Sequence, residues 1–126
     1  MLRLNSQGEM INQKDIKTLS ITLVGNAKVG TIYKGIVPQN MKLINSTIKA
    51  DVAPVGASLT IDVLKNGTSV LSKYLTLADT TYISNEDIVS LSSFSKNDTI
   101  EIKIVTTGAT QSGYNIMINL GFNLLY

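Results

Sequence analysis

The chain has 126 residues, of which 44% are hydrophobic and 16% are charged, and its formal net charge is +2. This balance predicts one globular domain with a modest core, and so small a net charge gives no reason to expect a nucleic-acid partner or an acidic membrane. Cysteine and histidine are absent, which excludes a disulfide framework, a thiolate nucleophile, and the commonest general base and metal ligand.

The first part of the chain differs from the rest. Residues 1–16 are polar and aperiodic, so we expect an N-terminal arm ahead of a β-sandwich domain over 17–126. The start is not followed by an apolar stretch, which predicts no secretory signal. Apolar runs stay well short of the roughly 20 residues that a membrane span needs, and a reducing compartment is expected.

Alternation of apolar and polar side chains then begins, which is typical of half-buried strands. A strand is predicted from Lys17 to the break at Gly25-Asn26, and a second over 31–37, before Pro38. A longer strand is predicted over 41–52. We assign its side chains to an apolar face, with Ser46 as an exception, and to an opposite face that includes Leu43. The apolar face comprises Ile44, Ile48, Ala50 and Val52.

A turn and another strand follow. Pro54 and Gly56 predict the turn, because proline presets φ and glycine tolerates positive φ. The next strand alternates, with three side chains pointing inward and Asp62 on the polar, solvated face. The inward side chains are Leu59, Ile61 and Val63.

Asn66-Gly67 is the strongest short hairpin signal available in a sequence and predicts a type I′ turn, with a return strand over 68–72. The region 74–94 is less regular. It is interpreted as a long connection between sheets, with a short strand around Leu75 and Leu77 and a single helical turn capped at 85–87.

The last two strands, over 99–105 and 114–124, show the clearest alternation of isoleucine with polar residues. Seven or eight short strands without a convincing helix predict an all-β fold with two antiparallel sheets. The simplest such fold is a jelly-roll-like sandwich, and a closed barrel is the alternative.

Catalytic chemistry is not expected. A serine or threonine nucleophile needs an activating base, and histidine is absent. The few acidic residues lie mostly at turns rather than in a facing pair. Glu86-Asp87 lacks the alternating oxygen ligands of a dedicated Ca²⁺ loop. We therefore predict no catalytic residues, no metal and no cofactor.

The tyrosines suggest a different kind of site. Tyr74, Tyr82 and Tyr114, with nearby amides in the loops, are candidates for a shallow carbohydrate-binding surface, and Tyr33 is a further tyrosine of the same kind. The alternative is that these amphipathic rings lie at sheet edges with their hydroxyls in water.

One resemblance adds to these observations. Residues 52–71 resemble a recurrent stretch of tailed-bacteriophage virion β-sandwich modules, found in fibres, baseplates and head appendages or decorations. In that stretch a proline–glycine turn precedes Asp-Val and then Asn-Gly-Thr. Residues 96–104 resemble the companion strand of those modules, and 114–122 their closing strand. The likeness therefore extends in patches over about 44–122, and the region 74–94 departs from it.

The resemblance implies a non-enzymatic structural protein of the virion, assembled in the bacterial cytoplasm through contacts with itself and with other virion proteins. By analogy with fibre modules it implies a homotrimer. The alternative is a receptor-binding module that recognises host surface carbohydrate. Fold analogy alone does not decide between these functions.

Overall fold

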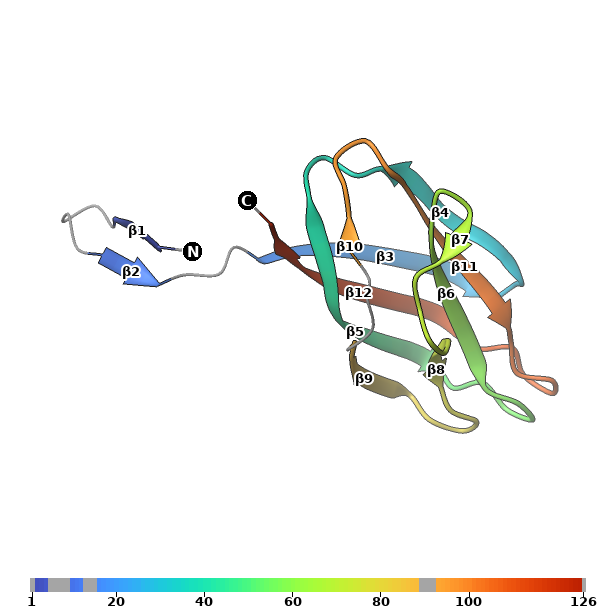
Figure 1. Cartoon of the computed structure of the whole chain (residues 1–126). Coiled ribbons are helices and arrows are strands. Elements are labelled where there is room, and N and C mark those ends of the chain that lie inside the picture. The colour runs from blue at the N-terminus through green and yellow to red at the C-terminus, as the bar shows by residue number, and fades with distance from the viewer. Residues whose placement is uncertain (1, 5–9, 13–15, 89–92, 126) are drawn as a thin grey trace.

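The computed structural model describes residues 2–4, 10–12, 16–88 and 93–125. Every regular element within these ranges is a β-strand (Figure 1). The strands are β1 (Leu2–Leu4), β2 (Met10–Asn12), β3 (Ile16–Asn26), β4 (Gly30–Ile36), β5 (Met41–Val52), β6 (Leu59–Lys65), β7 (Thr68–Ser69), β8 (Leu75–Leu77), β9 (Ile83–Asp87), β10 (Ser93–Phe94), β11 (Thr99–Thr106) and β12 (Tyr114–Leu124). This part of the chain has no helix that could cross a membrane.

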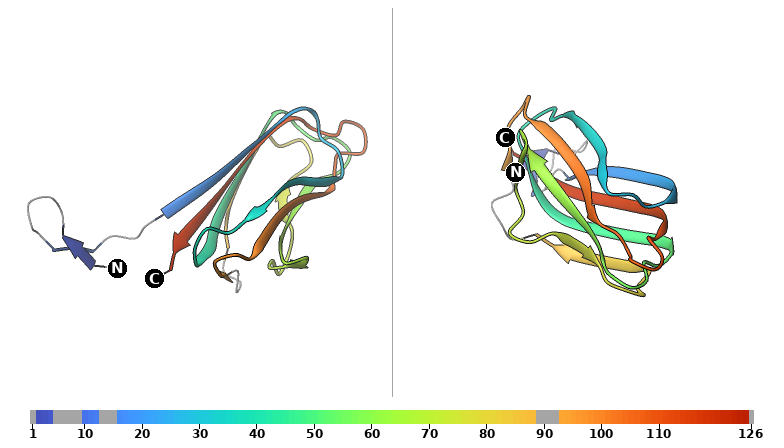
Figure 2. Two further views of the ribbon diagram at one scale, coloured as in Figure 1. Left: turned by 90° about the horizontal axis from the view of Figure 1, so that it is seen from above. Right: turned by 90° about the vertical axis from the view of Figure 1, so that its right-hand side faces the viewer.

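Ten of these strands form two antiparallel sheets (Figure 2). Sheet I has the order β3-β12-β5, and β9 and β10 follow one another along the free edge of β5. Sheet II has the order β4-β11-β6, and β7 and β8 share the edge of β6 in the same way. In a jelly roll, the strands of one long hairpin pair from its open end to its tip and then roll up into two sheets. The pairs here follow that order: β3 with β12, β4 with β11, β5 with β9 and β10, and β6 with β7 and β8. The jelly-roll prediction is therefore confirmed.

The remaining two strands, β1 and β2, pair only with each other within the described residues, and their register joins Arg3 to Ile11. Figure 1 shows this small hairpin apart from the two sheets, on the side where the C-terminus lies. The boundary of the arm at residue 16 remains a prediction.

The core lies between the sheets and follows the period of two. Branched and aromatic side chains from both inner faces fill it, because each strand turns alternate residues inward. Phe94 and Phe122 meet edge to face in sheet I, with ring centroids 6.2 Å apart. The fully buried large side chains are Leu43, Ile48, Leu59, Ile61, Leu77, Phe94, Ile102, Ile104, Ile116, Ile118, Leu120 and Phe122.

The assignment of faces in β5 is confirmed for Ile48 and Ala50, which are buried, but was wrong in the first part of the strand. Leu43, placed on the polar face, is fully buried, and the Ser46 side chain lies on the buried face. The reason is an irregularity in the pairing with β12: Gly121 faces Asn45, but the next residue, Phe122, faces Leu43. One extra residue in β5 therefore reverses the side-chain alternation part-way along the strand.

The interpretation of 74–94 was also wrong in part. The short strand at Leu75–Leu77 is confirmed as β8, but the predicted helical turn at 85–87 is part of the strand β9. This segment pairs with Asn45–Lys49 along the edge of β5, and tertiary pairing of this kind overrides local helix-capping signals. The return strand after Asn66-Gly67 is shorter than expected, since β7 ends at Ser69.

Candidate functional site

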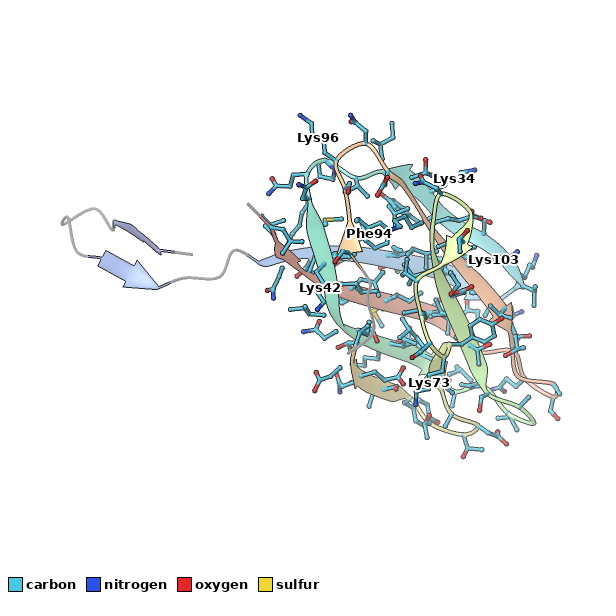
Figure 3. The ribbon with its side chains drawn as sticks, in the orientation of Figure 1. Lys34, Lys42, Lys73, Phe94, Lys96 and Lys103 are labelled. Carbon is cyan, nitrogen blue, oxygen red and sulfur yellow. The ribbon has the colours of Figure 1, made fainter. Side chains whose placement is uncertain are left out.

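The outer face of sheet II carries an open groove of about 420 Å³ beside β6. It forms where the chain leaves β7 and runs over 70–74 toward β8, so the segment folds back beside the middle of β6. Figure 3 shows Lys73 next to β8 and Lys103 on β11, the strand that flanks β6 on its other side. The groove is lined by Asp62, Ser69, Leu71, Ser72, Lys73 and Tyr74.

The exposure of Asp62 differs from the one predicted from the sequence. It points away from the core between Ile61 and Val63, as the alternation predicted, yet only 8% of it is exposed. The expected solvated position is therefore wrong. The Ser69 hydroxyl donates a hydrogen bond of 2.5 Å to Asp62 Oδ1, which ties the end of β7 to the carboxylate. Lys103 is the cross-strand neighbour of Asp62 in the ladder between β6 and β11.

The three candidate tyrosines lie at separate places in the two sheets. Tyr74, 45% exposed, lines the groove on sheet II. Tyr82 precedes β9 in sheet I, where its carbonyl accepts a hydrogen bond from the Ala50 amide. Tyr114 begins β12 and pairs with Val52 on β5, so β5 lies between the strands of Tyr82 and Tyr114. Tyr74 is thus the candidate that the fold places beside a buried polar group.

Sequence reasoning missed the partners of Tyr74. Asp62 and Ser69 come from opposite sides of the Asn66-Gly67 hairpin, whose prediction already placed the two strands side by side. What the alternation could not show is that 70–74 would lie beside β6 and line a groove together with Asp62.

Other carboxylates hold the backbone in place. The amide donors are Gly56 to Asp79 at 2.9 Å, Thr76 to Glu86 at 3.0 Å, and Ser95 to Asp98 at 2.7 Å. The Ser95 amide, and after it the Asn66 side chain, keep the pKa of the Asp98 carboxyl below its ordinary value. Within the described ranges, Asp and Glu side chains do not gather in a group of three that could hold a metal ion.

Comparisons with protein-family models and with curated proteins give no match. Solved structures do match in fold. The pairing order places the protein among jelly-roll sandwiches, the class that includes many viral capsid domains.

Within that class, the protein is similar to a chain of the cyanophage Pam1 capsid asymmetric unit, with a TM-score of 0.55 and 15% identity over 98% of this chain and 94% of that one. It is also similar to a chain of the acid-stable capsid of the Helicobacter pylori bacteriophage KHP30, with a TM-score of 0.52 and 11% identity over 89% of this chain and 92% of that one. A third likeness is to VP2 of the infectious bursal disease virus subviral particle, with a TM-score of 0.51 and 12% identity. It covers 91% of this chain but 34% of the VP2 chain. At these identities the likeness concerns the fold alone, a two-sheet β-sandwich.

Proposed function

We propose that this protein is a non-enzymatic structural component of a phage virion that acts through protein–protein assembly, as a capsid auxiliary or decoration protein. The observation that carries the proposal is the reciprocal coverage with the Pam1 chain, 98% of this chain against 94% of that one. A sandwich that accounts for nearly the whole of a capsid chain supports an assembly role better than a likeness to one domain of a larger protein. Head-fibre and tail or baseplate roles are the alternatives within the same class.

The outer face of sheet I is suited to such assembly. A row of uncharged polar side chains crosses its four neighbouring strands, from Ser20 through Asn119 and Thr47 to Asn85. Thr47 donates a hydrogen bond of 2.7 Å to Asn85 within this row. Small polar groups form hydrogen bonds across an interface without the desolvation cost of buried charges.

The proposal is tested on assembled particles. Quantitative mass spectrometry of purified virions should find the protein at a fixed ratio to the major capsid protein, and cryo-electron microscopy should place it on the head. Particles made without it should assemble poorly or lose DNA at a lower temperature. Density on the tail would move the role to the tail or baseplate. Absence from purified virions would refute the proposal.

We also propose that the protein forms a homotrimer before it joins the particle in the host cytoplasm. Native mass spectrometry should then give a mass three times the 13.6 kDa of one chain. A monomer at micromolar concentration would contradict a preformed trimer while leaving the virion role intact.

Recognition of host surface carbohydrate is the second candidate function. The observation that favours it is the position of Tyr74, whose exposed ring lies beside the buried Asp62 carboxylate. A glycan array with the purified protein separates the two functions. Saccharide-specific binding would support recognition, whereas no binding together with unstable particles lacking the protein would support a purely structural role.

A further inference from the structure

Asp62 is a charged side chain that the sandwich buries on the outer face of a sheet, away from the core. Burying a carboxylate is costly unless hydrogen bonds replace the water that it loses. An ionised carboxylate accepts about four hydrogen bonds, and the Ser69 hydroxyl supplies one of them. Because Asp62 lines the groove, a molecule that lies there can approach its carboxylate.

The other groups of the groove complement this acceptor. Tyr74 offers an exposed ring face, the Ser72 hydroxyl both donates and accepts, and the Lys73 ammonium donates. A concave site with an aromatic surface and a few convergent polar groups is the usual form of a small-molecule site. A pyranose ring has C–H groups that stack on an aromatic face and hydroxyls that bond to the polar groups at its rim.

The charges around the groove disfavour the binding of both cations and anions. Lys73 lines it, and Lys103 is the cross-strand neighbour of Asp62. Two ammonium groups near one carboxylate disfavour Ca²⁺, which takes about six to eight oxygen ligands. The buried carboxylate in turn disfavours an anion. A neutral ligand rich in hydroxyl groups meets both conditions.

We propose that this groove binds a neutral saccharide unit, with Asp62 accepting hydrogen bonds from its hydroxyls and Tyr74 stacking on its ring. The inference does not depend on the proposed structural role in a virion, since it concerns one face of the folded chain. It gives carbohydrate recognition a defined site, on sheet II rather than at Tyr82 or Tyr114.

The test is a titration of isotope-labelled full-length protein with glucose, galactose, mannose, rhamnose and N-acetylglucosamine, followed by amide-resolved NMR. At least one sugar should shift the amides of 69–74 and of Asp62 at up to about 100 mM, a range that detects millimolar affinity. Asp62→Asn keeps the size of the side chain and an acceptor for Ser69 but loses the charge. It should weaken binding about tenfold, as charged hydrogen bonds are stronger than neutral ones. Tyr74→Ala should do the same by removing the stacking surface.

The matched control is Tyr82→Ala, which removes an exposed ring just before β9 in sheet I. This variant should bind as the wild type does. If Asp62→Asn does not fold, as judged by its spectrum, Tyr74→Ala alone decides. The proposal is overturned if none of the five sugars shifts the groove amides, if the shifts map to Tyr82 or Tyr114 instead, or if folded groove variants bind like the wild type.

Discussion

At the scale of single residues, Asn66 and Gly67 show how one turn depends on two backbone conformations. Both have positive φ, 51° and 87°, as a type I′ turn requires. The Asn66 side chain also accepts a hydrogen bond from the Thr99 amide at 2.8 Å and donates one to Asp98 at 3.0 Å. The hairpin turn therefore also fixes the start of β11.

Gly67→Val should lower the free energy of unfolding by on the order of 1 kcal/mol or more, because a branched side chain resists positive φ. A Cβ at this position would meet no atom within 4 Å, so the effect comes from the backbone and not from a clash. Urea denaturation measures it. Gly67→Asn is the matched control and should lose less, since asparagine tolerates this conformation. Equal stability of the valine variant and the wild type would rule out the strained turn.

Asp98 gives a prediction on acid stability. A carboxyl whose pKa is lower in the folded state adds stability that is fully present above the unfolded pKa of about 4 and is lost as the pH falls through the folded pKa. Wild-type protein should therefore lose more stability than Asp98→Asn between about pH 5 and about pH 2. Urea midpoints across this range test the expectation.

Asn66→Ala provides a separate check in the folded state. It removes one of the groups that lower the pKa of Asp98 and leaves the Ser95 amide and Lys65 in place. The NMR titration midpoint of the Asp98 carboxyl should rise toward its ordinary value. A midpoint that does not move would show that Asn66 does not lower this pKa.

The residues that sequence reasoning placed well are those decided by their neighbours in the chain. Asn66-Gly67 is a local signal, so its turn could be predicted. Asp62 is buried and lines a groove with residues of the segment 70–74, a contact that alternation within β6 does not encode. Tyr74 could be chosen as exposed and aromatic, but its partners depend on that same packing.

At the scale of elements, β5 shows where the alternation of residues in the sequence no longer predicts which side chains face the core. Regular alternation predicts β3, β11 and β12 well, because each keeps one inward face over most of its length. In β5 the phase changes where Gly121 of β12 faces Asn45. A Cβ at Gly121 would lie 2.2 Å from Asn45 Oδ1, so glycine at this position gives room for the displaced side chain. The strand β9 was missed for a related reason, since it is held by the edge of β5.

Adjacent residues in β5 make this change of phase testable. Leu43→Ala should cost about 2–5 kcal/mol, the usual range for emptying a core position. Ile44→Ala should cost less than half as much, because Ile44 is only half-buried. Urea denaturation of both variants compares them directly. If Ile44→Ala lost more stability than Leu43→Ala, the side chains of β5 would alternate without interruption along the whole strand.

At the scale of the whole molecule, the jelly roll has two unlike ends. The C-terminus lies at one end, and the arm hairpin of β1 and β2 lies on that side, whereas the turns after β3, β5 and β11 gather at the other (Figure 1). The number and alternation of the strands in the sequence predicted the sandwich, but the order of its strands became clear only from the pairing of β3 with β12. Pairing between strands that are far apart in the chain is the feature that is hardest to predict from a sequence.

These two ends give a prediction that rests on the proposed virion role. If the arm end contacts the capsid, a short epitope inserted between Lys28 and Val29, in the exposed turn after β3, should remain open to antibody on intact particles. The same epitope fused ahead of Met1 should be hidden or should block incorporation. Immunogold labelling of both kinds of particle measures whether the antibody reaches the epitope. If only the N-terminal fusion is labelled, the end with the turns contacts the capsid instead of the arm end.

The position of β12 has a consequence for synthesis. It lies between β3 and β5 in sheet I, and its partner β3 is the first strand of the sandwich to leave the ribosome. A nascent chain therefore cannot close this sheet until β12 has emerged. Until then two long strands, β3 and β5, each present an unpaired edge to solvent. A polypeptide cut short before β12 lacks the strand that joins β3 to β5, so we expect premature termination to prevent folding of sheet I.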